Sequence, residues 1–228
     1  MDILDQAELQ DRYRQKCKEN EYNSLARRNQ HYFSIDDMPA RTSIMFRAQD
    51  FEITQDANIV LLHPSADSGM PHTRPGNIIC FSSDTDANRI TNTLLHEGMH
   101  LEQRKNPGLW KAYHIQQGWW PVSVAHLPSR WVERCRINPD TLDTPFWAWQ
   151  TNYVPLPLFT NEARPTLTEC DIRWFDLRNE TLLRSPPQSF IERYGTIAQP
   201  EHPNETSAIE LSKEGYSTRA ELYNVLRS

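Results

Sequence analysis

The segment from about residue 84 to residue 104 constrains the fold more than any other part of the chain. Ser83 or Asp84 can cap a helix here, and Asp86 suits the positive N-terminal end of a helix dipole. Apolar residues follow at helical spacing: Ile90, Leu94, Leu95 and Met99. The Asn-Pro-Gly sequence at 106–108 ends this pattern. The sequence therefore predicts one long helix with an apolar face against which other segments must pack.

Size and charge exclude several classes of protein. A chain of 228 residues suits one large domain and buries a core without metal or disulfide crosslinks. Its formal net charge of −6 argues against nucleic acid as the main partner, since phosphate binding needs a concentrated basic surface. The four cysteines form no C-x-x-C pair, and we expect reduced thiols. The N-terminus does not resemble a signal peptide, and no apolar run approaches a membrane span, so we expect a cytoplasmic protein without a membrane partner.

The segments before the long helix predict an α+β fold. Residues 1–33 carry a thin apolar stripe at helical spacing, which predicts a helical N-terminal arm. Three β-rich runs then follow, at residues 43–46, 58–62 and 77–81. We predict that these runs form a small, mainly antiparallel sheet packed on the long helix.

The chain after residue 107 is rich in aromatic and proline residues, and we predict a mostly helical C-terminal part. Helices are expected at residues 110–117, 129–135 and 203–226, the last interrupted near Gly215. Residues 137–166 are predicted to be irregular but ordered, because disordered segments have few aromatic side chains. The expected organisation is a single domain with an arm at 1–35, a sheet and helix at 40–106, and a C-terminal part at 107–228.

Three side chains of the long helix have the spacing that metal-dependent hydrolysis requires. His96 and His100 are four residues apart, so they lie on one helix face and can bind one ion together. Glu97 projects about 100° around the helix from His96, where a base that takes a proton from water beside the ion belongs. Zinc suits two neutral imidazoles. We therefore predict a zinc cofactor, two histidine ligands and a catalytic glutamate; the alternative is a helix with two ordinary histidines.

The pattern His96-Glu97-x-x-His100, directly after the β-rich run at 77–81, resembles that of the zincin superfamily of metallopeptidases. This resemblance implies a peptide or protein substrate whose extended backbone adds to the edge of a sheet. The matching edge strand would be residues 76–82, and residues 70–74 would form the rim of the cleft.

The third metal ligand separates the zincin subgroups. A metzincin pattern would require glycine at position 103 and histidine at position 106, and Gln103 and Asn106 exclude it. Gluzincins use a glutamate from a later helix, usually in a Glu-x-x-Ala pattern, which Glu205 and Ala208 match. Pro203 can begin that helix. The resemblance therefore implies Glu205 as the third ligand; the alternative is an ordinary carboxylate stabilised by a helix dipole.

Other residues stay open for the third ligand: Glu201, Glu210, His114, His126, Glu162, Glu169 and Asp171. An oxyanion-stabilising donor is also needed, and we select His202, three residues before Glu205. The alternatives for this donor are Tyr113, His114, Tyr153 and Tyr216.

The leading hypothesis is a gluzincin-like zinc metallopeptidase, in which the 107–228 part of one catalytic domain supplies the third ligand. A second hypothesis keeps the zinc site and replaces the peptide by a small amide, an ester or a biosynthetic intermediate. A third hypothesis is a non-catalytic interaction module stabilised by zinc or free of metal.

Overall fold

The computed structural model describes residues 2–228 and has the predicted α+β fold. Its residues divide into two compact units. The first unit comprises Met1–Gln15, Asn29–Trp110 and Ala208–Ser228, and the second comprises Lys16–Arg28 and Lys111–Ser207. The prediction of a single catalytic domain with three parts stays a prediction.

The sheet of the first unit has three strands, β1 (Asn58–Leu62), β2 (His72–Arg74) and β3 (Ile78–Ser82). Their order is β1-β3-β2, with β1 parallel and β2 antiparallel to β3. The sheet is therefore mixed, where we predicted a mainly antiparallel one. The prediction that residues 76–82 form an edge strand is wrong, because β3 pairs on both sides.

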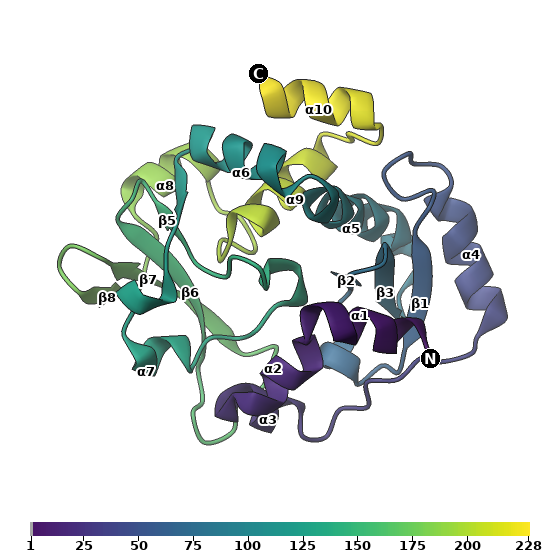
Figure 1. Cartoon of the computed structure of the whole chain (residues 1–228), viewed down its shortest axis with the longest axis horizontal. Helices are drawn as coiled ribbons and strands as arrows, with labels where there is room; N and C mark the ends of the chain where they lie inside the picture. The colour runs from purple at the N-terminus through teal and green to yellow at the C-terminus, as the bar shows by residue number, and fades with distance from the viewer. Residues whose placement is uncertain (1) are drawn as a thin grey trace. The chain divides into compact units, whose positions relative to one another are not determined.

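Both faces of this sheet are buried, which explains the nearly continuous apolar runs in β1 and β3. One face packs on α4 (Met38–Ala48) and α5 (Ile90–Lys105). Its core residues include Ile44, Ile59, Leu61, Ile79, Phe81, Leu94 and Leu101. The other face packs on α1 (Ile3–Asp11). Its core residues include Leu4, Ala7, Val60, Leu62, Ile78 and Cys80. Figure 1 shows the sheet with these helices around it.

The predicted strand at residues 43–46 is instead part of α4. The side chain of Asp37 accepts a hydrogen bond from the backbone N–H of Ala40 and caps this helix, with a proline in its first turn. Ile44 and Ala48, four residues apart, are the buried residues of α4. The β-rich composition of 43–46 is thus overridden by a cap and a helical core face.

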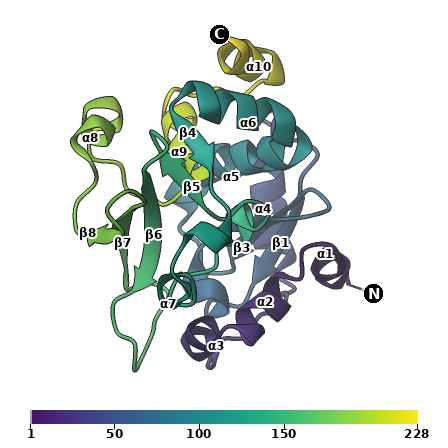
Figure 2. The same ribbon diagram turned by 60° about the vertical axis from the view of Figure 1, so that its left-hand side comes forward.

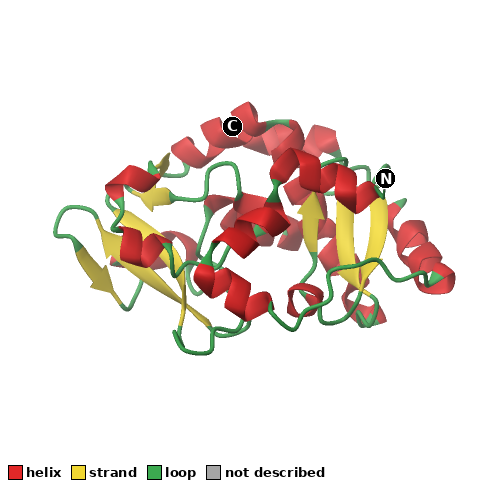
Figure 3. Cartoon of the chain, turned by 60° about the horizontal axis from the view of Figure 1, so that its bottom comes forward, coloured by secondary structure: helices red, strands yellow, loops and turns green. Residues whose placement is uncertain are grey.

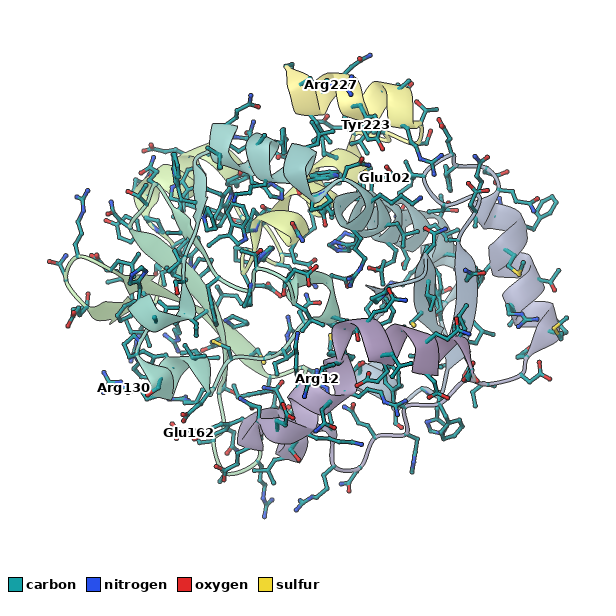
Figure 4. The ribbon with its side chains drawn as sticks, in the orientation of Figure 1. Arg12, Glu102, Arg130, Glu162, Tyr223 and Arg227 are labelled. Carbon is teal, nitrogen blue, oxygen red and sulfur yellow. The ribbon has the colours of Figure 1, made fainter. Side chains whose placement is uncertain are left out.

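The long predicted helix forms as α5, but it begins later than expected. The side chain of Asp86 caps a short 3-10 turn, η2 (Ala87–Arg89), and α5 follows from Ile90 to Lys105. The C-terminal helix α10 (Arg219–Arg227) is tied to α5 through the buried Glu102. Glu102 accepts hydrogen bonds from the hydroxyl of Tyr223 and, at 2.9 Å, from Nε of Arg219; Glu102 and Tyr223 are labelled in Figure 4.

The predicted N-terminal helix forms as three short helices, α1, α2 (Tyr13–Glu19) and α3 (Glu21–Arg27). Arg12 ends α1 with a left-handed backbone conformation (φ 53°), and the side chain of Asn20 caps α3. α1 is joined to β2 by Arg74, a fully buried residue that binds both carboxylate oxygens of Asp11 at 2.7 and 2.8 Å. This bidentate pair fixes the first helix to the sheet.

The second unit contains an antiparallel five-stranded sheet that we did not predict (Figures 2 and 3). Its strands, in spatial and chain order, are β4 (Trp119–Pro121), β5 (Trp147–Trp149), β6 (Tyr153–Phe159), β7 (Cys170–Asp176) and β8 (Thr181–Leu183). The expectation of a mostly helical C-terminal part is therefore wrong for these segments. In β6 the alternating Val154, Leu156 and Leu158 face one core, a period of two that the intervening prolines obscured.

Short helices complete the chain, and most lie where the sequence predicts. They are α6 (Pro107–Gln116), α7 (Ser129–Val132), α8 (Gln188–Tyr194) and α9 (Pro203–Lys213), with 3-10 turns η1 (Ala66–Gly69), η3 (Val124–His126) and η4 (Pro139–Thr141). Gly215, with φ 79°, separates α9 from α10 as expected. Within residues 2–228 there is no disulfide, and no helix combines the length and the apolar character needed to span a membrane.

Gly98 gives a test of how tightly α5 packs. A Cβ at this position would lie 2.7 Å from Cδ1 of Ile53 and 2.8 Å from Cγ2 of Thr54. Alanine normally stabilises a helix interior relative to glycine by about 1 kcal/mol. We expect Gly98→Ala to destabilise instead, by about 1–3 kcal/mol in urea unfolding, because it overpacks the contact with the 53–54 turn. The double variant with Ile53→Ala should show a loss smaller than the sum of the single losses, and strict additivity would contradict this explanation.

Candidate metal site

α5 brings the two predicted histidine ligands together. The Nε2 atoms of His96 and His100 are 3.1 Å apart, and the ring planes meet at 82°. Two nitrogens bound to one tetrahedral zinc, each at about 2.0–2.1 Å, are roughly 3.3 Å apart. His100 is buried, whereas His96 is partly exposed. The two imidazoles therefore aim their outer nitrogens at nearly one point, at a spacing that fits a shared ion.

Gln103 holds the ring of His100 in this orientation. Its Oε1 lies 2.7 Å from Nδ1 of His100, and Gln103 is itself buried. Because an amide oxygen only accepts, Nδ1 carries the proton, and the lone pair of Nε2 points toward His96. We used Gln103 only to exclude the metzincin pattern and did not predict its contact with His100. The spacing could have indicated it, because residues three apart on a helix are neighbours.

The predicted ligands come from both compact units. His96 and His100 belong to the first unit and Glu205 to the second, so their joint binding of one ion stays a prediction. Asp140, in the second unit, is a further carboxylate that could hold a metal ion. Asp140 was not predicted, because it belongs to the irregular region before β5 and has no motif around it. The chain thus has His, Glu and Asp groups that could hold a metal ion.

Two of these carboxylates are deeply buried, which matters for their chemistry. Glu97 and Glu205 are each only 3% exposed. Glu205 stands in the first turn of α9, as expected, and its Oε1 accepts a 2.7 Å hydrogen bond from Nδ2 of Asn138. A buried ionised carboxylate is costly unless donors or a cation compensate it. Both positions therefore suit residues that act on or near a cation.

His202 makes hydrogen bonds at the start of α9, and its predicted oxyanion role stays a prediction. Its Nε2 lies 2.8 Å from the carbonyl oxygen of Thr144, and its Nδ1 accepts a 3.0 Å hydrogen bond from the backbone N–H of Asn204. A neutral imidazole has one N–H, and here Thr144 receives it. The ring therefore anchors the start of α9 to the segment that carries Thr144.

The alternative ligands are engaged elsewhere or lie on the surface. Glu201 is buried and paired with Arg136 at 2.6 Å, and burial raises the pKa of its carboxyl group. His114 is buried against Asn204 and the ring of Trp147, and burial lowers its pKa to about 3, which keeps it neutral. The remaining alternatives for the third ligand do not belong to any group of described residues that could hold a metal ion. They are Glu210, His126, Glu162 (labelled in Figure 4), Glu169 and Asp171.

Comparisons with known proteins identify no relative of this chain. No family model, no curated protein and no solved structure matches the chain. The function must therefore be argued from the chemistry and geometry of the residues above.

Replacing Gln103 tests whether it orients His100. Gln103→Met removes the acceptor while keeping a side chain of similar length. We expect zinc affinity to fall by about 10- to 100-fold in competition with a coloured chelator, as is typical when the partner of a ligating histidine is lost. The control is Gln188→Met, which removes an exposed amide that donates to Glu192. Equal affinity in the Gln103 variant and the control would contradict the assigned role.

Proposed function

We propose that the chain is a zinc-dependent hydrolase of the metallopeptidase type. The observation that carries this proposal is the convergence of the His96 and His100 Nε2 atoms at 3.1 Å on a helix that also carries Glu97. Without a metal this spacing is that of a hydrogen bond between one N–H and one lone pair, and the same spacing suits two lone pairs that share one cation. The donor set of two imidazoles and one carboxylate is the set that catalytic zinc sites use.

His96, His100 and Glu205 are the residues that would hold the zinc. A bound zinc lowers the pKa of a coordinated water toward about 7 and polarises the carbonyl group of a substrate. Three protein ligands leave a fourth position open, which a purely structural site would fill.

Glu97 would act as the general base. Its carboxylate takes a proton from the attacking water and returns it to the leaving nitrogen, so that one residue serves both proton transfers. Glu97 is only 3% exposed, so this base is largely shielded from bulk water. The tight packing around the neighbouring Gly98 holds the base in a fixed position.

The strand pairing in the three-stranded sheet favours a second class of substrate, a small amide or ester. β3 pairs on both sides, so it has no free edge. On β2, the carbonyl oxygen of the fully buried Thr73 accepts a 3.0 Å hydrogen bond from Nη2 of Arg104. Nε of Arg104 also donates to Oγ1 of Thr73. A peptide could add to this sheet edge only by displacing Arg104. This closed edge favours a small amide or ester over an extended polypeptide.

Substitution of the base tests the proposed mechanism. We expect Glu97→Gln to keep its zinc and to lose nearly all hydrolysis of amide substrates, because the amide side chain cannot accept the proton of water. The metal is measured by elemental analysis and the turnover by release of the amine. Glu169→Gln, at an exposed glutamate, is the matched control and should keep full activity. Full activity in Glu97→Gln would refute the mechanism.

Substrate size separates the two candidates. If Arg104 remains hydrogen-bonded to Thr73 of β2, no extended chain can pair with this edge. The zinc-loaded protein should then hydrolyse dipeptide-sized amides and leave an unfolded polypeptide intact. Arg104→Ala should then increase cleavage of the polypeptide, while Lys111→Ala, at an exposed cation, should not. Cleavage of the polypeptide by the unaltered protein, in an assay of fragment release, would exclude the small-substrate candidate and favour the peptidase.

A further inference from the structure

We propose that Asn138 positions Glu205 for metal binding and that the N-terminal helix α3 holds Asn138 in place. This inference rests on the proposed function, because it assigns roles around the same metal site. Glu205, Asn138 and the residues of α3 all belong to the second unit, so the contacts that join them lie within one compact body. The proposal gives α3, part of the N-terminal segment, a role in positioning a metal ligand.

The side-chain amide of Asn138 can face Glu205 in only one way. Its Oδ1 accepts a 2.9 Å hydrogen bond from the backbone N–H of Asp140, which caps the η4 turn. Its Nδ2 must therefore point in the other direction, where it donates to Oε1 of Glu205 at 2.7 Å. The cap thus fixes the amide, and the amide fixes the carboxylate plane.

A neutral donor is well suited to a metal ligand. Arg136, two residues before Asn138, pairs with Glu201 at 2.6 Å. Asn138 gives Glu205 an uncharged N–H, which orients the carboxylate without neutralising it. This hydrogen bond therefore does not remove the negative charge with which Glu205 would bind a cation. A guanidinium in the position of Asn138 would compete with that cation.

The backbone that carries Asn138 is held by two side chains of α3. Asn23 is fully buried; its Nδ2 donates to the carbonyl oxygen of Cys135 at 2.8 Å, and its Oδ1 accepts from the backbone N–H of Ile137 at 2.9 Å. Nη2 of Arg27 donates to the carbonyl oxygen of Ile137 at 3.0 Å. These bonds join segments more than a hundred residues apart in the sequence. They immobilise the residue directly before Asn138.

The decisive variant separates positioning from the capping role. Asn138→Ser keeps an oxygen that can cap η4, but the shorter side chain cannot reach Glu205. Asn179→Ser is the matched control, because Nδ2 of Asn179 donates to Oδ2 of Asp176 at 2.8 Å in the same unit, between β7 and β8. Both variants lose one Asn–carboxylate hydrogen bond, and only the first loses it at the metal site.

We expect Asn138→Ser to lower zinc affinity by about 10- to 100-fold in chelator competition, while Asn179→Ser leaves it unchanged. Substitution with cobalt gives a second readout, since a reoriented Glu205 should alter the visible absorption bands of bound Co²⁺. Thermal melting of both variants without metal checks folding. Asn23→Ser should lower zinc affinity in the same direction, because it releases the backbone before Asn138.

Each outcome bears on the proposal. Unchanged affinity and an unchanged cobalt spectrum in Asn138→Ser would overturn it, even if the protein is less stable. An equal loss in Asn138→Ser and Asn179→Ser would also overturn it, because the effect would then be general destabilisation. If the unaltered chain binds neither zinc nor cobalt, the proposed function fails, and that failure is distinct from a failure of the positioning role.

Discussion

The packing of α5 is the constraint on which the candidate site depends. One part of this helix fills the core under the three-stranded sheet through Leu94 and Leu101, and Glu102 ties it to the C-terminal helix. Gly98 lets the 53–54 turn approach the helix where any side chain would clash. These contacts fix the position of α5, and the hydrogen bond with Gln103 fixes the ring of His100 on it.

Burial of charge is the second constraint, and it links the fold to a cation. Glu97 and Glu205 are almost completely buried, and buried carboxylates persist only with donors or positive charge nearby. The neutral hydrogen bond from Asn138 orients Glu205 without neutralising it. The positive charge of a divalent ion would compensate a buried carboxylate, so ion binding would also contribute to local stability.

The sequence predicted local chemistry well and long-range pairing poorly. The spacing of His96 and His100 was sufficient to predict their convergence, because helix geometry alone brings them together. The strands β4 to β8 were not predicted, because tryptophan and proline residues interrupt the alternation of apolar and polar side chains that indicates a strand. Asn138, Asp140 and the structural role of His202 could not be foreseen, because each depends on partners distant in the sequence. The edge strand was misassigned since register and strand order leave no local pattern.

The central claim is that His96, His100 and Glu205 bind one zinc ion together. A crystal structure of the zinc-loaded chain, with anomalous diffraction at the zinc edge, tests it most directly. The account predicts one strong anomalous peak at about 2.0–2.2 Å from Nε2 of both histidines and from a carboxylate oxygen of Glu205. A peak bound to other side chains, or no peak at the pair of histidines, would contradict the account.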